Sequence, residues 1–230
     1  MEAVILCGGL GTRLRSVISG IPKPMAPVGG RPFLSILLTR LSCVDEIDRV
    51  ILSTGYLSST IVSYFGHSFE GLHIDYCEEK TALGTGGAIC KSFQMVESSW
   101  CMVQNGDTYL DFSISEIVKS PHWQMKNIIV AKKLVQNSRY GMLVLEGDRV
   151  IGFKEKINGN SSGYINGGTY FLNKDIFIKE REFERKFSFE IDFLPKAVLD
   201  SQYYAYKTNG KFIDIGVPED YIIAQTILRT

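Results

Sequence analysis

The first 131 residues alternate between short apolar runs and segments whose apolar residues recur at helical spacing. Leu34, Leu37, Leu38 and Leu41 lie three or four positions apart, and similar spacing follows residue 58 and residue 113. The apolar runs that predict strands are residues 3–7, 49–53, 73–77, 100–104 and 127–131. Strands that alternate with helices are typical of βαβ units, so this part of the chain predicts a parallel sheet flanked by helices.

The second half of the chain has a different pattern, with short strands close together. The predicted strands are residues 142–145, 149–153, 164–172 and 203–207. The turn at residues 146–148, Glu-Gly-Asp, joins the first two into a hairpin. The polar segment 157–163 is expected to be a loop and the most mobile element. We therefore expect one domain with two halves, residues 1–131 and 132–230, the second adding a β layer over one side of a cleft.

Composition narrows the function classes. The 230 residues are 45% hydrophobic and 22% charged, with a formal net charge of +0. This balance argues against nucleic acid or an anionic membrane as the main partner, and no apolar run reaches the length of a membrane span. The N-terminal segment lacks the basic stretch of a secretory signal. Five scattered cysteines without C-x-x-C spacing are typical of reduced thiols, so we expect a cytoplasmic protein. A homodimer is compatible with the sequence.

The first apolar run ends in three clustered glycines, Gly8, Gly9 and Gly11. Glycines after a strand let a ligand approach the main chain and leave N–H groups free for phosphate oxygens. Arg13 and Lys23 add positive charge beside this loop, so it is predicted to bind a nucleoside triphosphate. Neither the P-loop pattern nor the G-x-G-x-x-G pattern of dinucleotide sites fits the spacing. A glycine-rich turn without a ligand is the structural alternative.

Two aspartates follow apolar segments that lie far apart in the chain. Asp107 ends the sequence Asn105-Gly106-Asp107 after an apolar run, and Asp214 lies inside an apolar segment. A carboxylate at the carboxyl end of a strand faces the cleft of an α/β sheet, where it can ligate a hard cation. Taken singly, each aspartate is more often a cap, a turn residue or half of a salt bridge.

Three separated pieces of the chain, GGLGTRL at residues 8–14, PKPM at 22–25 and PVGGRP at 27–32, resemble the opening motif of the sugar-1-phosphate nucleotidyltransferases. Cys7 and Ser16 stand where many members have alanine and proline. The resemblance covers nearly the whole chain. It implies an α/β fold with a Rossmann-like, mixed, mostly parallel sheet flanked by helices and a β layer over the sugar site. It also implies an enzyme that joins a nucleoside triphosphate to a sugar 1-phosphate and releases pyrophosphate.

The resemblance further implies roles for individual residues. The implied catalytic residues are Arg13 and Lys23. The implied nucleotide-binding residues are Leu6, Gly8, Gly9, Gly11, Thr12, Glu79, Gly84, Thr85 and Asp107. The implied sugar-phosphate-binding residues are Glu155, Lys156, Asn166, Gly168 and Glu190. Asp107 and Asp214 match the family's pair of aspartates that hold Mg²⁺, the implied cofactor. A proline usually follows the matched lysine, but Ile157 follows it here. The role of Asp192 stays open.

A glutamate in the sequence Glu78-Glu79 is implied to read the base. On a strand the two side chains point to opposite faces, so only one of them can do so. A carboxylate only accepts hydrogen bonds. Guanine offers two neighbouring N–H donors on its pairing edge, whereas uracil and thymine offer one donor between two acceptors. The sequence therefore favours GTP over UTP or dTTP.

The segment LGTGGAI at residues 83–89 and the short chain most resemble guanylyltransferases for manno-heptose 1-phosphate, which supply GDP-heptose for surface glycans. Several alternatives stay open: mannose 1-phosphate or N-acetylmuramate 1-phosphate as acceptor, and uridylyl or thymidylyl transfer. A catalytically inactive nucleotide-sugar sensor is disfavoured because Arg13, Lys23, Asp107 and Asp214 are all present. A metal-dependent glycosyltransferase is disfavoured because the Asp-x-Asp pattern of such enzymes is absent after the matching strand.

Overall fold

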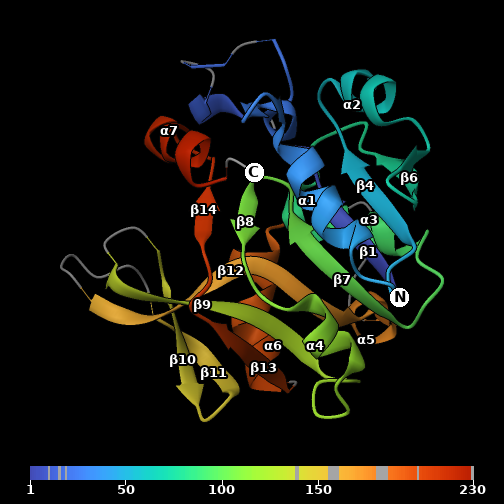
Figure 1. The fold of residues 1–230 in the computed structure, drawn as a ribbon. Helices are drawn as coiled ribbons and strands as arrows, with labels where there is room; N and C mark the ends of the chain where they lie inside the picture. Colours follow the sequence, from blue (N-terminus) through green and yellow to red (C-terminus); the bar gives the residue numbers. More distant parts are fainter. Residues whose placement is uncertain are drawn as a thin grey trace.

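The structure is a computed structural model that describes residues 1–9, 11–14, 17–18, 20–137, 140–154, 161–179, 186–200 and 202–228. Its centre is a twisted sheet (Figure 1). The strands of the first half are β1 (Glu2–Leu6), β4 (Arg49–Thr54), β5 (Ser68–Phe69), β6 (Leu72–Glu78) and β7 (Trp100–Asn105). In the order β7-β1-β4-β6 they pair in parallel, and β5 pairs antiparallel at the edge. The predicted parallel sheet is confirmed for four of the five expected strands, whose ends lie within a residue of those expected.

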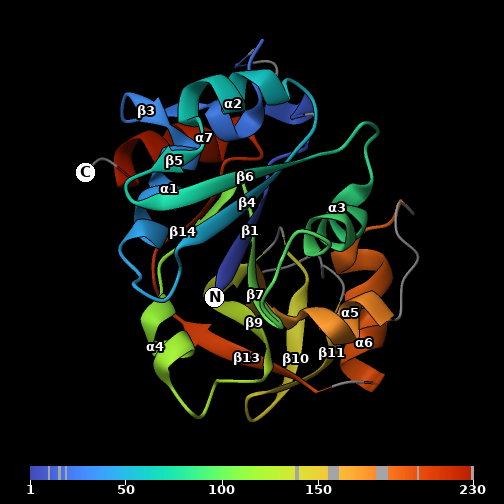
Figure 2. The same cartoon turned by 90° about the vertical axis from the view of Figure 1, so that its right-hand side faces the viewer.

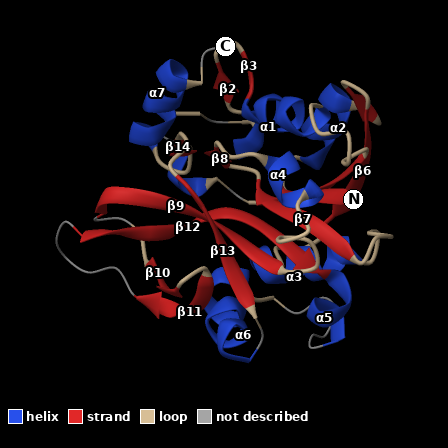
Figure 3. Ribbon diagram, turned by 60° about the horizontal axis from the view of Figure 1, so that its bottom comes forward, coloured by secondary structure: helices blue, strands red, loops and turns tan. Residues whose placement is uncertain are grey.

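The strands of the second half extend the same sheet. They are β9 (Asn127–Asn137), β10 (Met142–Glu146), β11 (Arg149–Lys154), β12 (Ser161–Asn173) and β13 (Tyr203–Thr208). β12 joins β7 antiparallel, and the order continues β9-β13-β11-β10. The fifth strand of the predicted parallel sheet, expected at residues 127–131, is β9, which runs six residues further and pairs antiparallel with β12. The sheet curls at this end, so that β10 also pairs with β12 (Figure 3). The predicted β layer is thus built as a continuation of the main sheet. β12 includes residues 161–163, which were expected in a loop, and residues 157–160 lie outside the described residues.

Helices cover both faces of the sheet (Figure 2). One face carries α1 (Phe33–Ser42), α2 (Ser58–Phe65), α4 (Ile114–Lys119) and α7 (Pro218–Ile227), and the other carries α3 (Gly84–Phe93), α5 (Lys174–Lys179) and α6 (Leu194–Asp200). The central strands supply both cores because successive side chains point to opposite faces. Ala3 and Ile5 pack in the first core, whereas Val4 packs in the second. Such strands are apolar throughout, which is why the sequence marks them clearly.

Two short sheets lie beside the large one. β14 (Phe212–Asp214) pairs antiparallel with β8 (Thr108–Leu110), and β2 (Pro27–Val28) pairs with β3 (Arg31–Pro32). The Tyr221 hydroxyl on α7 donates to the Pro27 carbonyl at 2.6 Å, so α7 is fixed to the hairpin near the start of the chain. These pairings bring the C-terminal segment back to the carboxyl end of β7. None of the helices described is long and apolar enough to cross a membrane.

Candidate active site

Two adjoining cavities open at the carboxyl ends of the parallel strands, where α/β sheets place their ligands. The first, which we call the nucleotide pocket, has a volume of about 410 Å³. Nine residues predicted to contact nucleotide or phosphate line it: Leu6, Gly8, Gly9, Gly11, Lys23, Glu79, Gly84, Thr85 and Asp107. The remaining lining residues, which no motif singled out as ligands, are Cys7, Pro24, Ala82, Ala88, Asn105, Gly106 and Lys186.

Neighbouring groups approach the main chain closely at Gly8, after β1, and at Gly106, after β7. A Cβ on Gly8 would overlap the carboxylate of Glu79. A Cβ on Gly106 would lie 2.6 Å from the Leu6 carbonyl oxygen, which accepts a hydrogen bond from the Gly106 N–H at 3.0 Å. The ends of β1 and β7 are therefore in direct contact, and the pocket floor is main chain rather than side chain.

Lys23, Asp107 and Asp214 form one charged cluster. The Lys23 ammonium lies 2.5 Å from Asp107 Oδ2. β14 pairs with β8 so that Asp214 lies opposite Thr108, and the Ile215 N–H donates to the Asp107 carbonyl at 2.9 Å. Burial and the negative charge of Asp107 raise the pKa of Asp214, while Lys23 and Arg13 act in the opposite direction. The two predicted metal-binding aspartates are thus neighbours in space although 107 positions separate them in sequence.

Arg13 lies on a 3-10 turn (Thr12–Leu14) and is exposed. It does not line either cavity, but its charge reaches Asp214. Thr12 belongs to the same turn, and its side chain is outside the described part of the structure.

The two neighbouring glutamates at the end of β6, Glu78 in the strand and Glu79 directly after it, have different partners. Glu78 Oε1 accepts a hydrogen bond from the Ser58 hydroxyl at 2.6 Å, near the surface. Glu79 lines the nucleotide pocket, where its carboxylate accepts from the Leu83 N–H at 2.9 Å and the Ser53 hydroxyl at 3.3 Å. Glu79 also lines a side cavity of about 480 Å³ with Tyr56 and Lys80. Of the two, Glu79 is the one whose carboxylate faces the predicted base site.

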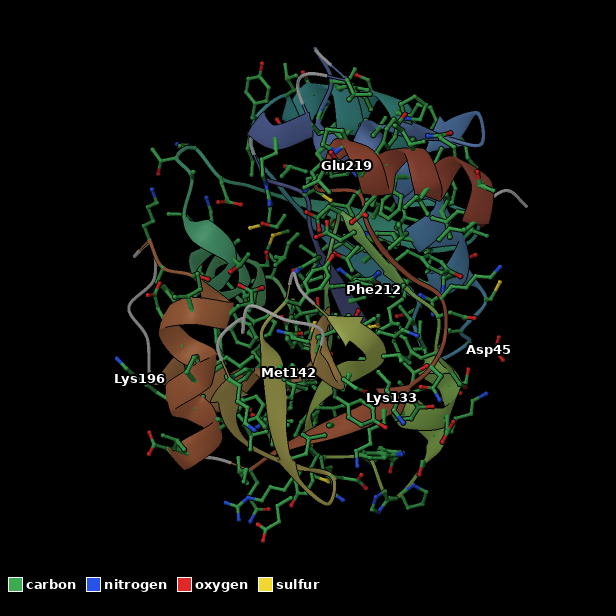
Figure 4. All side chains as sticks on the ribbon, turned by 90° about the vertical axis from the view of Figure 1, so that its left-hand side faces the viewer. Asp45, Lys133, Met142, Lys196, Phe212 and Glu219 are labelled. Atoms are coloured by element: carbon green, nitrogen blue, oxygen red, sulfur yellow. The ribbon has the colours of Figure 1, made fainter. Side chains whose placement is uncertain are left out.

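The second cavity, which we call the sugar pocket, has a volume of about 660 Å³. Predicted residues that line it are Asn166, Gly168, Glu190 and Asp214. Phe212, labelled in Figure 4, lines it from β14 and packs edge-on against Tyr140, with ring centres 5.6 Å apart. Further lining residues that the motifs did not assign include Thr108, Phe153, Lys154, Tyr170, Ile191 and Pro195. Glu155 and Lys156, both predicted to hold the sugar phosphate, lie outside the described residues.

Comparison with known proteins agrees with this geometry. The model of the nucleotidyl transferase family matches residues 2–230. The chain belongs to this family. It is 44% identical over 231 residues to the D-glycero-alpha-D-manno-heptose 1-phosphate guanylyltransferase of Aneurinibacillus thermoaerophilus, covering 100% of this chain and 99% of the relative.

Two further similarities extend over the length of this nucleotidyl transferase. It is 43% identical over 222 residues to the D-glycero-alpha-D-manno-heptose 1-phosphate guanylyltransferase of Campylobacter jejuni, covering 96% of this chain and 97% of the relative. The crystal structure of HddC from Yersinia pseudotuberculosis complexed with GMP-PN superimposes with a TM-score of 0.84 at 37% identity, covering 97% of each chain. The predicted fold class is therefore confirmed.

The charged cluster of this nucleotidyl transferase has the chemistry of a hard-cation site. Divalent cations such as Mg²⁺ take carboxylate oxygens together with substrate phosphates and water. Asp107 and Asp214 offer two carboxylates side by side. Burial and the charge of Asp107 raise the pKa of Asp214, and a cation between the carboxylates would favour their ionised forms. Among the described residues, no group of three or more His, Cys, Asp and Glu side chains is placed to hold a metal. A site built from two aspartates fits an ion whose remaining ligands come from substrate.

Asn105 is the residue that the motifs missed most clearly. It lines both cavities, and its side-chain oxygen is buried with no hydrogen-bond partner in the described structure. A buried acceptor without a donor is unfavourable, so a donor group of a bound substrate would stabilise it. The signal in the sequence was its place beside Asp107 at the end of a strand.

The role of Asp192, which the sequence left open, is structural. Its Oδ2 accepts from the Ser188 N–H at 2.7 Å, while the Ser188 hydroxyl accepts from the Ile191 N–H at 3.2 Å. The two residues cap the start of the helical turn Phe189–Phe193 reciprocally, as in a capping box. This cap holds Glu190 at the edge of the sugar pocket.

Proposed function

We propose that this nucleotidyl transferase moves a guanylyl group from GTP to D-glycero-α-D-manno-heptose 1-phosphate, with release of pyrophosphate. The observation that carries the proposal is the position of the charged cluster at the junction of two cavities. Lys23 and Asp107 line the nucleotide pocket, Asp214 lines the sugar pocket, and Asn105 lines both. The full-length similarity to two heptose 1-phosphate guanylyltransferases supports the choice of acceptor.

The reaction needs positioning and charge stabilisation more than acid–base chemistry. An oxygen of the sugar phosphate attacks the α-phosphorus of GTP, forming one P–O bond while the bond to the β-phosphate oxygen breaks and pyrophosphate leaves. The attacking phosphate is already an anion, so no protein base is required. The glycine-loop amides and Lys23 would bind the triphosphate, and the exposed Arg13 would neutralise the departing phosphates. This division of labour is typical of phosphoryl and nucleotidyl transfer.

Asp107 and Asp214 would hold Mg²⁺ in this proposal. The bound ion would supply Lewis-acid stabilisation of negative charge on the phosphates. Lys23, which pairs with Asp107 at 2.5 Å in the structure, would then be free to shift toward the triphosphate.

Guanine selectivity is proposed to rest on Glu79. Its carboxylate faces the nucleotide pocket, and a carboxylate matches the two adjacent donors of guanine. The Leu83 N–H holds the carboxylate in place from the loop before α3. In this proposal residues 1–131 supply most of the nucleotide pocket and residues 132–230 most of the sugar pocket. Lys186 from the second half also lines the nucleotide pocket, and Asn105 and Thr108 from the first half also line the sugar pocket.

The test is a matrix of pyrophosphate-release assays with purified protein. The triphosphates are GTP, UTP, dTTP, CTP and ATP, and the acceptors are the 1-phosphates of manno-heptose, mannose, glucose and N-acetylmuramate. We expect the largest kcat/KM for GTP with heptose 1-phosphate, by about tenfold or more over the other pairs, because a buried polar group left unpaired discriminates strongly. A higher value for mannose 1-phosphate or for UTP would contradict the proposed substrate. Binding of GTP without turnover of any acceptor would favour a sensor.

A further inference from the structure

Thr85 and Glu190 connect the two cavities. Thr85 lines the nucleotide pocket and Glu190 lines the sugar pocket, and neither residue lines the other cavity. Nevertheless the Thr85 hydroxyl donates to Glu190 Oε2 at 2.5 Å, across 105 positions of sequence. The sequence assigned the two residues separately, one to each substrate, so this contact was not expected.

The contact belongs to a wider clamp between the start of α3 and the segment after residue 186. The Thr85 hydroxyl also accepts from the Phe189 N–H at 2.8 Å. The Phe187 N–H donates to the Leu83 carbonyl, and the Gly86 N–H donates to the Phe187 carbonyl, each at 3.0 Å. These bonds tie the loop that carries Gly84 and Thr85 to the segment that carries Glu190. A displacement of one segment must therefore move the other.

Hydroxyl groups fix the position of the Glu190 carboxylate. Besides Thr85, the Ser188 hydroxyl donates to Oε2 at 3.2 Å and the Tyr170 hydroxyl donates to Oε1 at 3.4 Å. Within the described part of the chain, the groups that bond this carboxylate are uncharged, and the Thr85 bond is the shortest of them. All three are charge-assisted hydrogen bonds, which are stronger the shorter they are, so Thr85 has the largest share in orienting the carboxylate.

We propose that Thr85 is a positioning residue that couples the two substrate pockets. Nucleotide held against the loop at residues 83–85 fixes Thr85, which fixes Glu190 in the orientation that accepts hydroxyl groups of the sugar. Binding in one pocket then strengthens binding in the other, and the effect is reciprocal because it is a free energy of coupling. This inference rests on the proposed function, since it takes a nucleotide and a sugar 1-phosphate as the two ligands.

The test measures this coupling by binding rather than turnover. The dissociation constant of heptose 1-phosphate is measured by calorimetry, alone and with a GTP analogue that carries a methylene bridge between the α- and β-phosphates. The bridge replaces the bond that would break, so no reaction occurs. We expect the analogue to tighten sugar-phosphate binding about fivefold or more in the native protein. In Thr85→Val, which keeps the shape but lacks the hydroxyl, the ratio should fall below about twofold, and Thr85→Ser should restore it.

Tyr170→Phe is the matched control, because it removes another hydroxyl from the Glu190 carboxylate without breaking the link to α3 or the cap at Ser188. It should weaken sugar-phosphate binding but keep the ratio. Glu190→Gln, which weakens the same bond from the other side, should lower the ratio if Thr85→Val does not fold. A native ratio in Thr85→Val, or an equal loss in Tyr170→Phe, would overturn the inference. Absence of pyrophosphate release from every substrate pair would instead count against the proposed function, because the binding ratios do not depend on turnover.

Discussion

At the scale of single residues, the placement of two aspartates side by side, with Lys23 beside them, indicates what the site binds. Burial and Asp107 both raise the pKa of Asp214, so the isolated protein holds this carboxylate in an unfavourable state when it is ionised. Lys23 relieves part of the repulsion by pairing with Asp107. A divalent cation would relieve more of it, and the cluster is therefore electrostatically suited to bind one.

Asp107→Asn and Asp214→Asn should each remove a metal ligand. We expect each to weaken Mn²⁺ binding at least tenfold, since even the residues that only support metal ligands have effects of about 10- to 100-fold. Turnover should fall by about 10²–10³, as for other losses of charge stabilisation. Titration of Mn²⁺ followed by electron paramagnetic resonance measures the affinity. Asp148→Asn, which breaks only a pair with Lys207 at the β10–β11 hairpin, is the control. Native Mn²⁺ affinity in either variant would exclude that residue from the metal site.

Glu79→Gln should change base selectivity. The amide oxygen can still accept from the Leu83 N–H, but the amide nitrogen presents a donor where guanine also presents donors. A mismatched buried group costs about 1–3 kcal/mol, so we expect kcat/KM for GTP to fall about tenfold to hundredfold and the UTP/GTP ratio to rise. Competition assays with both triphosphates measure the ratio. Glu78→Gln is the neighbouring control, since Glu78 bonds Ser58 near the surface. Equal effects in both variants would mean that Glu79 does not read the base.

The sequence indicated individual residues where a motif supplies side-chain chemistry, and gave no indication where a side chain acts on another part of the protein. Lys23 and Asp107 were singled out by their charge and place in the sequence and Glu79 by the family resemblance, and all three line the nucleotide pocket. Asp192 caps a helical turn, and the bond from Thr85 to Glu190 depends on a contact between distant segments. Neither local spacing nor hydrophobic periodicity carries that information.

At the scale of secondary structure, α3 shows why glycine-rich segments mislead sequence analysis. Glycines are poor residues for a helix interior, so the run at residues 84–87 reads as a loop. In the structure α3 begins at Gly84. Gly84 itself has a φ of +71°, and a Cβ there would lie 2.5 Å from the Phe187 carbonyl oxygen. The glycines are needed for the clamp against residues 187–190, and packing against that segment outweighs helix propensity.

Three further helices, α5, α6 and α7, were not predicted from the sequence either.

Comparing Gly84→Ala with Gly147→Ala separates two costs of a side chain: the strain of a left-handed backbone and a clash with neighbouring atoms. Both glycines have positive φ, +71° and +58°, but nothing lies within 4 Å of a Cβ placed on Gly147. Left-handed backbone alone costs about 1–2 kcal/mol for a residue with a side chain, and that is the loss expected for Gly147→Ala. Gly84→Ala adds a clash with main chain and should lose about 1–3 kcal/mol more, the cost of overpacking. Urea unfolding measures both. Equal losses would mean that residues 187–190 simply move away.

At the scale of the whole molecule, the architecture was predictable because its central strands are buried on both faces. Strands buried on both faces are near-continuous runs of apolar residues, and exposed segments lack such runs. The sequence therefore indicates the mixed sheet and the helices that cover it. The pairing of β14 with β8 was not predictable, because three-residue strands give no periodic signal, and yet this pairing brings Asp214 to Asp107. The family motifs indicated that Asp107 and Asp214 act together, but they did not show which strands bring the two side by side. The site is therefore a product of topology, in which the last strand returns to the end of a strand from the first half.

Glu2 lies at the start of the central strand β1, at the end of the parallel strands opposite the site. Its Oε2 accepts from the Glu97 and Ser98 N–H groups at 2.8 and 2.7 Å and from the Ser98 hydroxyl at 2.8 Å, and its Oε1 lies 2.6 Å from Arg49. Burial alone would raise the pKa of Glu2, but the bonds from Ser98 and Glu97 and the charge of Arg49 lower it overall. The carboxylate thus joins β1, β4 and the segment that leads into β7.

Glu2→Gln should destabilise the fold in a pH-dependent way. The amide oxygen can replace only one of the two carboxylate oxygens, so either Arg49 or the donors of Glu97 and Ser98 lose their acceptor, and we expect a loss of about 1–3 kcal/mol at pH 7. Because folding lowers the pKa of Glu2, the native stabilisation is fully present above the ordinary carboxyl value of 4.5 and is lost as the pH falls through the lowered value. The difference in unfolding free energy between the native protein and the variant, measured in urea, should therefore shrink below pH 4.5.

Glu97→Gln is the control. The Glu97 carboxylate is 88% exposed and lies 3.5 Å from the same Arg49, so its loss should change stability by less than about 0.5 kcal/mol. A constant difference across the acid range would show that Glu2 does not act through its charge.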